Sequence, residues 1–342
     1  MEPNTEGGRL TAKEPPAPPG RETARQTDLG RRVLSGVRYV RSGGVVIAFV
    51  AMIIAFSIAR PDIFPTYSNA RTILFSSVAL GIIAIGLTVV LSIGQFDLSI
   101  GAMVGISGAC AVLAMANGHV ITPVAVIVGI LAGGTIGVFN GLIVAYGRVP
   151  AFIGTLAVGS IGTGIERGVT LDNTIYQGVH ESYAAISRYN IVGFPASVWV
   201  WLGTLVVIWI LLDLTVFGRR IYSIGANEEA ARLAGVRTAR VKMAAFVVLG
   251  LCGGLTGVII TAQAFSYYPN SGTPLLLPAY AAAFLGSSVL GGAKFHPLAT
   301  VFGVLFTGTL ATGLIMLEFP SWSTNVLQGV VLALAVLLAR LR

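Results

Sequence analysis

Residues 73–94 read ILFSSVALGIIAIGLTVVLSIG, a run without a charged side chain. About 20 apolar residues in a helix span the hydrocarbon core of a bilayer. The apolar residues follow one another continuously, whereas the strands of a membrane barrel alternate with a period of two. This stretch therefore predicts a membrane-spanning α-helix.

The rest of the chain repeats this pattern. Of its 342 residues 55% are hydrophobic and 11% are charged, and the mean hydropathy is +0.83. A soluble globular chain carries about 25% charged residues, so lipid must be the main solvent of this one. We expect an all-α, polytopic membrane protein of about ten transmembrane helices, from apolar segments at 44–59, 73–94, 100–116, 120–146, 150–170, 197–217, 241–265, 277–291, 297–317 and 322–339.

Charged residues outside these segments indicate the topology. Residues 1–42 contain eight Lys/Arg, five Asp/Glu and the run EPPAPPG but no apolar stretch, which predicts a disordered cytoplasmic arm rather than a signal peptide. Residues 43–342 form the expected transmembrane domain, with a polar loop at 218–242. With ten spans and both termini in the cytoplasm, 18 of the 22 Lys/Arg lie inside, as the positive-inside rule requires. The four outer ones are Arg60, Arg71, Arg167 and Arg188.

Glycines recur at helical spacing in two of the segments. Small residues let helix backbones approach closely inside a bilayer, where the hydrophobic effect does not drive helices together. Close packing is therefore expected at Gly129, Gly133, Gly137 and Gly141, and at Gly250, Gly253, Gly254 and Gly257.

The polar loop contains a short helix with clear start and stop signals, in the sequence FGRRIYSIGANEEAARLAGVRTARVK at 217–242. Asn227 is a good N-cap, and Glu228 and Glu229 follow where acidic side chains complement the helix dipole. Arg232 lies near the end of this helix, and Gly235 is placed to terminate it.

One face of this helix is apolar, with Ala230, Leu233 and Ala234 at helical spacing. So short a helix does not persist alone in water. It needs a surface to lie against, either the membrane domain or a partner protein.

The sequence of this loop resembles that of a loop in the permeases of ABC importers, in the monosaccharide branch typified by ribose permeases. In that branch the loop reads close to GR-x-x-Y-x-x-G-x-N-x-x-A-x-R-x-x-G. The matching positions are Gly218, Arg219, Tyr222, Gly225, Asn227, Ala230, Arg232 and Gly235. The resemblance implies a coupling helix that docks into a separate ATPase. The residues expected to couple are Gly225, Asn227, Glu228, Glu229, Ala230, Arg232, Leu233 and Gly235.

A second stretch, GQFDLSIGAMVGISG at 94–108, resembles the signature G-G-x-D-L-S-x-G of the same family, with Gln95 in place of a glycine. A carboxylate at bilayer depth is costly and should face protein, water or a helix N-terminus. Asp97 either caps the helix that begins near Ser99 or takes part in the translocation path, and the two roles are compatible. The candidate path residues are Asp97, Ser99, Gly101 and Asn140.

Residues 272–292 and 140–168 extend the resemblance from about residue 70 to the end of the chain. In the former segment Leu276 and Pro278 stand where sugar permeases commonly carry an acidic pair, which leaves ribose itself in doubt as the solute.

The remaining intramembrane polar residues are few. Asn140 lies beside the glycine face and is placed to contact solute or a neighbouring helix. For Glu166 we expect the side chain to extend toward the membrane surface. Asp213 is expected to pair with Arg219 or Arg220.

The sequence contains no GxxxxGK[ST] phosphate-binding loop. It also shows no catalytic constellation and no metal-ligand spacing, so we expect a chain that is not an enzyme and needs no cofactor of its own. The resemblance implies partners: ATPase subunits that hold Mg-ATP, a periplasmic or extracellular solute-binding protein, a second permease copy and membrane lipid, but no nucleic acid. The implied cargo is a small sugar-like solute, and the implied location is the bacterial inner membrane. A secondary transporter or channel is the alternative, and a membrane enzyme is a weaker one.

Overall fold

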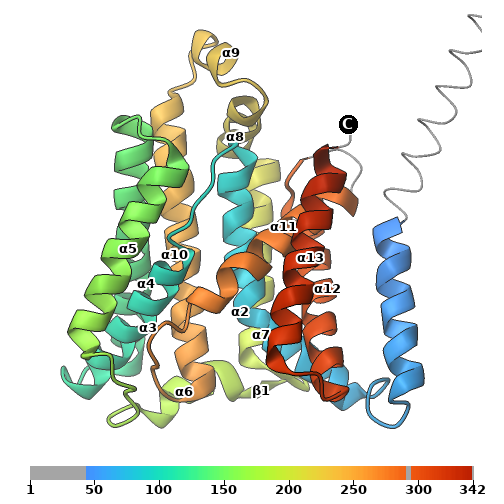
Figure 1. Cartoon of the computed structure of the whole chain (residues 1–342). Helices are drawn as coiled ribbons and strands as arrows, with labels where there is room; N and C mark the ends of the chain where they lie inside the picture. The colour runs from blue at the N-terminus through green and yellow to red at the C-terminus, as the bar shows by residue number, and fades with distance from the viewer. Residues whose placement is uncertain (1–43, 290–293, 341–342) are drawn as a thin grey trace, which may run out of the picture. The chain divides into compact units, whose positions relative to one another are not determined.

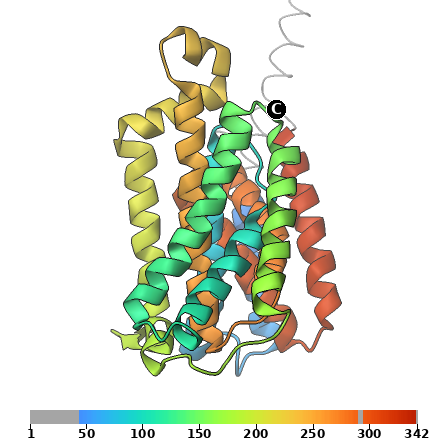
Figure 2. The ribbon, with the colours of Figure 1, turned by 90° about the vertical axis from the view of Figure 1, so that its left-hand side faces the viewer.

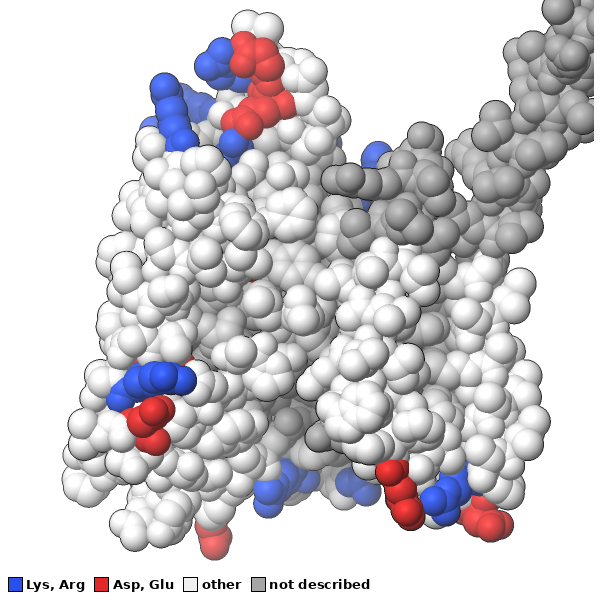
Figure 3. Space-filling model, in the orientation of Figure 1, with Lys and Arg blue, Asp and Glu red and all other residues white. Residues whose placement is uncertain are grey.

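The structure is a computed structural model that describes residues 44–289 and 294–340. The predicted arm at 1–42 lies outside these residues. Most Lys, Arg, Asp and Glu side chains visible in Figure 3 lie toward the two ends of the molecule, with an uncharged band between them. This distribution is the one that a membrane-spanning protein requires, because charges are costly in hydrocarbon.

Five of the described helices are long and apolar enough to cross a membrane. They are α2 (Tyr67–Ser92), α4 (Thr122–Gly141) with its π-helical continuation η1 (Leu142–Tyr146), α7 (Ala196–Trp209) with η2 (Ile210–Leu214), α10 (Thr238–Ala264) and α12 (Pro297–Met316). The other helices in the predicted segments are Gly44–Ala59, α3 (Ile100–Ala116), α5 (Ala151–Thr170), α11 (Leu276–Val289), preceded by the 3-10 turn η3 (Thr273–Leu275), and α13 (Ser321–Arg340). Each predicted segment contains a helix, so the all-α membrane fold is confirmed, while ten crossings remain a prediction.

The connecting elements gather at opposite ends of the bundle (Figures 1 and 2). One end, here called the α6 end, carries α6 (Glu181–Arg188) and the antiparallel strands β1 (Asn190–Ile191) and β2 (Phe194–Pro195). The other, the α9 end, carries α8 (Val216–Ala226) and α9 (Glu228–Leu233).

Helix α2 forms the core of the bundle. Its residues from Ser77 to Ser92 are buried, and it packs against α7, α10, α11 and α12. The apolar run at 73–94 therefore contacts mainly protein. The helix is thus enclosed from Ser77 onward, whereas its first residues, 67–76, are exposed or half-buried apart from Asn69.

The glycines pack closely, as their spacing predicted: those of α4 meet Gly250 and Gly254 of α10, whereas Gly253 and Gly257 pack against α3. A Cβ atom added at Gly133 would lie 2.5 Å from the Gly250 carbonyl oxygen, and one at Gly137 would lie 2.4 Å from that of Phe246. At Gly133 and Gly137 backbone therefore meets backbone between α4 and α10, and no side chain fits between the helices there.

This contact predicts the effect of adding one methyl group. Gly133→Ala should destabilise the protein by about 1–3 kcal/mol, because the atoms that the new Cβ meets are backbone and cannot rotate away. The measurement is the thermal melting midpoint in detergent. Gly203→Ala in α7 is the matched control, since a Cβ there meets nothing within 4 Å. Equal melting of the two variants would contradict the packing.

Candidate functional site

The segment between α2 and α3 is not helical, and a buried polar network holds it. In Figure 1 the chain leaves α2 near the α9 end and descends to α3, which starts part-way down the bundle. Asp97, Ser99 and Asn140 are fully buried. The Asp97 Oδ1 atom accepts from the Ser99 amide at 2.7 Å and from its hydroxyl at 2.6 Å, and Oδ2 accepts from Asn140 Nδ2 at 2.8 Å. Three of the four candidate path residues are therefore in direct contact.

The cap predicted for Asp97 takes a different form. Helix α3 begins at Ile100 with Ser99 as its N-cap, and Asp97 accepts from the Ser99 amide rather than from an amide of the first helical turn. This local bond shapes the turn that precedes the helix, as Asp side chains commonly do in loops. Asp97 therefore directs the chain into α3 without capping it.

Neighbouring helices satisfy the backbone of this break. The Tyr280 hydroxyl, from α11, accepts from the Asp97 amide at 2.8 Å and donates to the Asp97 carbonyl at 2.9 Å. The Leu98 amide donates to Thr155 Oγ1, from α5, at 3.0 Å. Non-helical backbone at membrane depth is stable only where protein or water satisfies its polar groups. Helices α4, α5 and α11 thus fix the break in place.

A cavity of about 320 Å³ lies beside this network, between α3, α5 and the η3–α11 segment. We call it the α3–α5 cavity. Its lining residues are Leu98, Gly101, Ala102, Leu156, Gly159, Ser160, Thr163, Thr273 and Leu276. Gly101 is the one candidate path residue on its wall. Asp97, Ser99 and Asn140 lie buried behind the wall, so in this structure they support the cavity rather than line it.

The sequence pattern did not indicate the hydroxyls of Ser160, Thr163 and Thr273. Serine and threonine are common in membrane helices, and only the packing of α5 and η3 against α3 brings these three to one cavity. They add hydrogen-bonding groups to a wall that is otherwise apolar.

The prediction for Glu166 was wrong. Its side chain is buried, and Oε1 accepts from the Tyr267 hydroxyl at 2.7 Å and from the Asn270 amide at 3.1 Å. It therefore ties α5 to the connection that leads into η3, and it lies against α3, because a Cβ added at Gly105 would be 2.3 Å from Glu166 Oε2. No local pattern predicts this role, because both partners lie far away in the sequence.

Asp213 also has a different partner from the one predicted. Its Oδ2 lies 2.7 Å from His296 Nε2, so η2 is joined to the start of α12. Close by, the Phe295 carbonyl accepts from Ser92 Oγ and from the Tyr222 hydroxyl, each at 3.2 Å. Burial raises the pKa of Tyr222 to about 12, so its hydroxyl keeps the proton that it donates. Helices α2, α8 and α12 therefore meet at one carbonyl group.

The predicted short helix is present as α9. Asn227 Oδ1 accepts from the Ala230 amide at 2.9 Å, and Gly235 has a φ of +83°. Lys242 Nζ lies 2.6 Å from a Glu228 carboxylate oxygen, which joins the start of α9 to α10. A Cβ at Gly225 would lie 2.0 Å from the Ser92 carbonyl oxygen, so α8 ends directly on the end of α2.

The apolar face of α9 points away from the bundle. Leu233 is 80% exposed, and Ala230 and Ala234 are exposed too. Ala231 is the residue that α9 buries. The sequence indicated that this face lies against either the membrane domain or a partner protein. In the structure it does not lie against the membrane domain.

Residues 69–336 match a protein family described as the permease component of a branched-chain amino acid transport system. The chain belongs to this permease family. The ribose import permease protein RbsC of Bacillus subtilis is 34% identical over 317 residues, which cover 92% of this chain and 97% of that protein. Its counterpart in Escherichia coli K12 is 33% identical over 91% of this chain and 97% of its own length. The L-arabinose ABC transporter permease protein AraH of Azospirillum brasilense is 30% identical over 91% of each chain.

The network around Asp97 predicts a mutual dependence of two residues. Asp97→Asn places an amide NH₂ group against the Asn140 amide, and Asn140→Asp places two carboxylates together. Each single variant should lose about 3 kcal/mol of stability, because a buried donor or acceptor is left unsatisfied. The double exchange, Asp97→Asn with Asn140→Asp, restores a donor facing an acceptor and should recover most of the loss.

Melting midpoints in detergent measure all three variants. Additive losses in the double variant would mean that the two side chains act independently, contrary to the geometry.

Proposed function

We propose that this chain is the membrane-spanning subunit of an ATP-driven importer for a small neutral sugar or sugar-like solute. The observation that carries the proposal is the α3–α5 cavity, which offers three hydroxyls among apolar residues. The printed names of the relatives, which are ribose and arabinose permeases, support the solute class.

The position of the cavity suits a binding site in a transporter. It lies where two interrupted segments meet, the 93–99 break before α3 and the connection before η3 and α11. Both α3 and α11 begin beside it, at Ile100 and Leu276. In membrane transporters, solute sites near the bilayer midplane are typically formed by discontinuous helices of this kind.

The chemistry of the lining favours a neutral solute over an amino acid. An amino acid carries an ammonium and a carboxylate group, and in low dielectric each requires an opposite charge or several hydrogen bonds. No charged side chain lines the cavity among the described residues. Ribose, arabinose and xylose present hydroxyls and apolar ring faces, which match hydroxyls and leucines.

In the proposed mechanism, α9 receives mechanical work from a separate ATPase that holds Mg-ATP. Its exposed face is the docking surface, and α8 passes the motion to Ser92 and Phe295. From Phe295 a row of aromatic rings leads to the break. The ring centroids are 5.2 Å apart between Phe295 and Phe284, 6.5 Å between Phe284 and Tyr280, and 5.9 Å between Tyr280 and Phe96. Tyr280 holds the backbone of Asp97. A displacement of α8 thus has a continuous series of contacts through which to reach the cavity wall.

The remaining parts of the proposal concern the assembly. The α9 end faces the cytoplasm, together with both termini, in the inner membrane of a bacterium. Two permease copies, identical or related, flank the path, and a solute-binding protein docks at the α6 end. A secondary transporter is the less favoured alternative, because the carboxylate of Asp97 is already engaged by Ser99 and Asn140.

The docking surface is tested by charge substitution on α9. Leu233→Asp or Arg232→Glu should abolish co-purification of the permease with its ATPase, because each places an acidic group at the apolar tip. Leu171→Asp is a matched control, since that leucine is 79% exposed, about as much as Leu233, but follows α5 toward the α6 end. If the Leu233 and Arg232 variants retained the ATPase as Leu171→Asp does, the coupling role would be wrong.

The solute class is tested by uptake into proteoliposomes that contain permease, ATPase and solute-binding protein. Ribose, arabinose and xylose are compared with leucine, and we expect ATP-dependent uptake of a sugar. Ser160→Ala and Thr273→Val should each lower that uptake about three- to tenfold, the effect of losing one hydrogen bond. Thr135→Val is the control, because its hydroxyl bonds to the Leu131 carbonyl as that of Ser160 does to Leu156, but it lies in a separate groove. Uptake of leucine alone, or of a sugar without ATP, would refute the proposal.

A further inference from the structure

A groove of about 410 Å³ lies between α4 and α5, with α3 behind them. We call it the α4–α5 groove. Helix α5 separates it from the α3–α5 cavity, because at 3.6 residues per turn the two sets of lining residues occupy opposite faces of α5. The α5 residues are Val158, Ile161, Gly162 and Ile165 in the groove, and Leu156, Gly159, Ser160 and Thr163 in the cavity.

The groove is apolar. Ile136 of α4 is buried in its wall, while Phe139 and Ile161 are more than half exposed. Thr135 contributes a hydroxyl, but that hydroxyl bonds to the Leu131 carbonyl at 2.8 Å. No charged side chain lines the groove among the described residues. Its occupant must therefore be apolar over this length.

The groove is too narrow for a helix of another chain. Its lining residues on α4 run from Ala132 to Ile143, which is about 17 Å of helix at 1.5 Å per residue. Spread over that length, 410 Å³ corresponds to a mean cross-section of about 24 Å². A helix with its side chains is at least about 10 Å across and fills about 80 Å². A single hydrocarbon chain is the more suitable occupant.

The groove leads toward a basic residue at the α9 end. Helix α4 starts at the α6 end, where Thr122 Oγ1 lies 2.6 Å from the Ser182 hydroxyl of α6, so η1 and the connection 147–150 lie at the other end (Figure 1). Arg148, in this connection between α4 and α5, is exposed. It has no carboxylate oxygen within 4 Å among residues 44–289 and 294–340.

The level of this connection is that of lipid headgroups. Tyr146, two residues before Arg148, is 55% exposed. Tyrosine side chains are enriched where a bilayer meets water. The positive charge of Arg148 therefore lies where an apolar groove meets the membrane surface.

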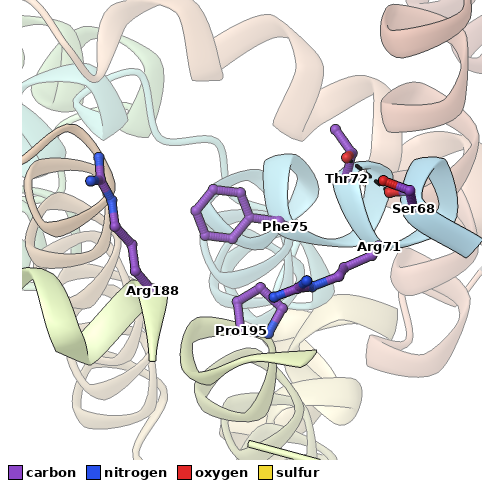
Figure 4. Close-up of a pocket in the computed structure, with 6 residues that line it drawn as sticks. All are labelled: Ser68, Arg71, Thr72, Phe75, Arg188 and Pro195. Atoms are coloured by element: carbon purple, nitrogen blue, oxygen red, sulfur yellow. Dashed lines mark hydrogen bonds between the residues drawn. The ribbon is translucent and has the colours of Figure 1, made fainter. Parts of the chain in front are cut away.

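The hollow in Figure 4, at the α6 end, has a different character. It measures about 260 Å³, and most of the side chains that line it are polar, including Arg71 and Arg188. Arg71 donates to the Asn190 side-chain oxygen, and Arg188 donates to the Gln263 carbonyl. No apolar groove of the kind beside Arg148 accompanies these two arginines.

We propose that the α4–α5 groove binds one acyl chain of an anionic phospholipid whose headgroup lies at Arg148. Such a lipid matches both features, because its chain is apolar and its phosphate suits the fork of a guanidinium group. It belongs to the leaflet at the α9 end, which the proposed function makes the cytoplasmic one. The binding itself does not depend on that function.

The lipid would support the wall of the α3–α5 cavity. Helix α5 lies close to α3, since a Cβ added at Gly159 would be 3.0 Å from the Ser99 Cα atom. On the groove side, Ile161 is 62% exposed and Ile165 is 49% exposed. An acyl chain packs against these side chains and holds α5 against α3 from the face opposite the cavity.

The headgroup is tested with the intact permease in nanodiscs of phosphatidylcholine, with or without phosphatidylglycerol. Native mass spectrometry measures the lipid that each permease retains, and the wild type should retain phosphatidylglycerol in preference. Arg148→Gln should weaken this retention about fivefold, the contribution of one arginine beside an anionic lipid. Arg219→Gln is the matched control, because Arg219 is also exposed at the α9 end without a carboxylate within 4 Å in the described chain, but lies on α8 away from the groove.

The groove is tested by filling it. Thr135→Phe places a ring among the lining residues and should release the lipid although Arg148 is intact. Leu131→Phe, one turn away on α4 at a position 58% exposed but outside the lining, should retain it, and so should Thr135→Val, which keeps the shape of the wall. Phosphatidylglycerol should raise the melting midpoint of the wild type but not that of Thr135→Phe or Arg148→Gln. Melting in phosphatidylcholine alone establishes that each variant is folded.

Three results would overturn the inference. The first is equal retention of phosphatidylcholine and phosphatidylglycerol by the wild type, and the second is unchanged retention in both Arg148→Gln and Thr135→Phe. The third is dissociation of permease dimers by Thr135→Phe without loss of lipid, since a second copy would then fill the groove. A permease that bound the lipid as expected but imported no sugar would support this inference while refuting the proposed function.

Discussion

The arrangement of this protein depends on the rule that no backbone polar group can remain unsatisfied in hydrocarbon. A continuous helix meets this rule by itself, but the 93–99 break does not. Thr155 from α5 and Tyr280 from α11 bond to the backbone of the break, and Asn140 from α4 holds the Asp97 carboxylate. The cavity exists because the chain can depart from the helix at this depth, and it departs only where these partners are present.

The same contacts connect the ends of the molecule to its middle. Tyr280 bonds to both sides of the Asp97 peptide backbone and stacks in a row of rings that reaches Phe295. Ser92 and Tyr222 bond to the Phe295 carbonyl, so the end of α2 and the helix beside α9 share an acceptor. Glu166, which lies against α3, joins α5 to the approach to η3. The walls of the cavity are thus tied to both ends of the bundle through hydrogen bonds and packed rings.

The sequence predicted those features that depend on local order. Continuous apolar runs predicted the helices, and Asn227 with its following glutamates predicted α9 within a residue of its start. Spacing also placed the glycines of α4 on one face. Contacts between distant residues had no such signature. Asp213 had arginines nearby in sequence but pairs with His296, and Glu166 lies near a helix end but points inward to Tyr267. Which hydroxyls share the cavity likewise followed only from how α5 and η3 pack against α3.

The glycine contact between α4 and α10 has a mechanical consequence. Most helix pairs interlock through side chains that form ridges and grooves, so translating one helix along the other requires the ridges to separate. Between Gly133 and Gly254 no ridges exist, because both surfaces are bare backbone. At this crossing, a lengthwise displacement of one helix along the other separates no interlocked side chains, and the two backbones keep their van der Waals contact.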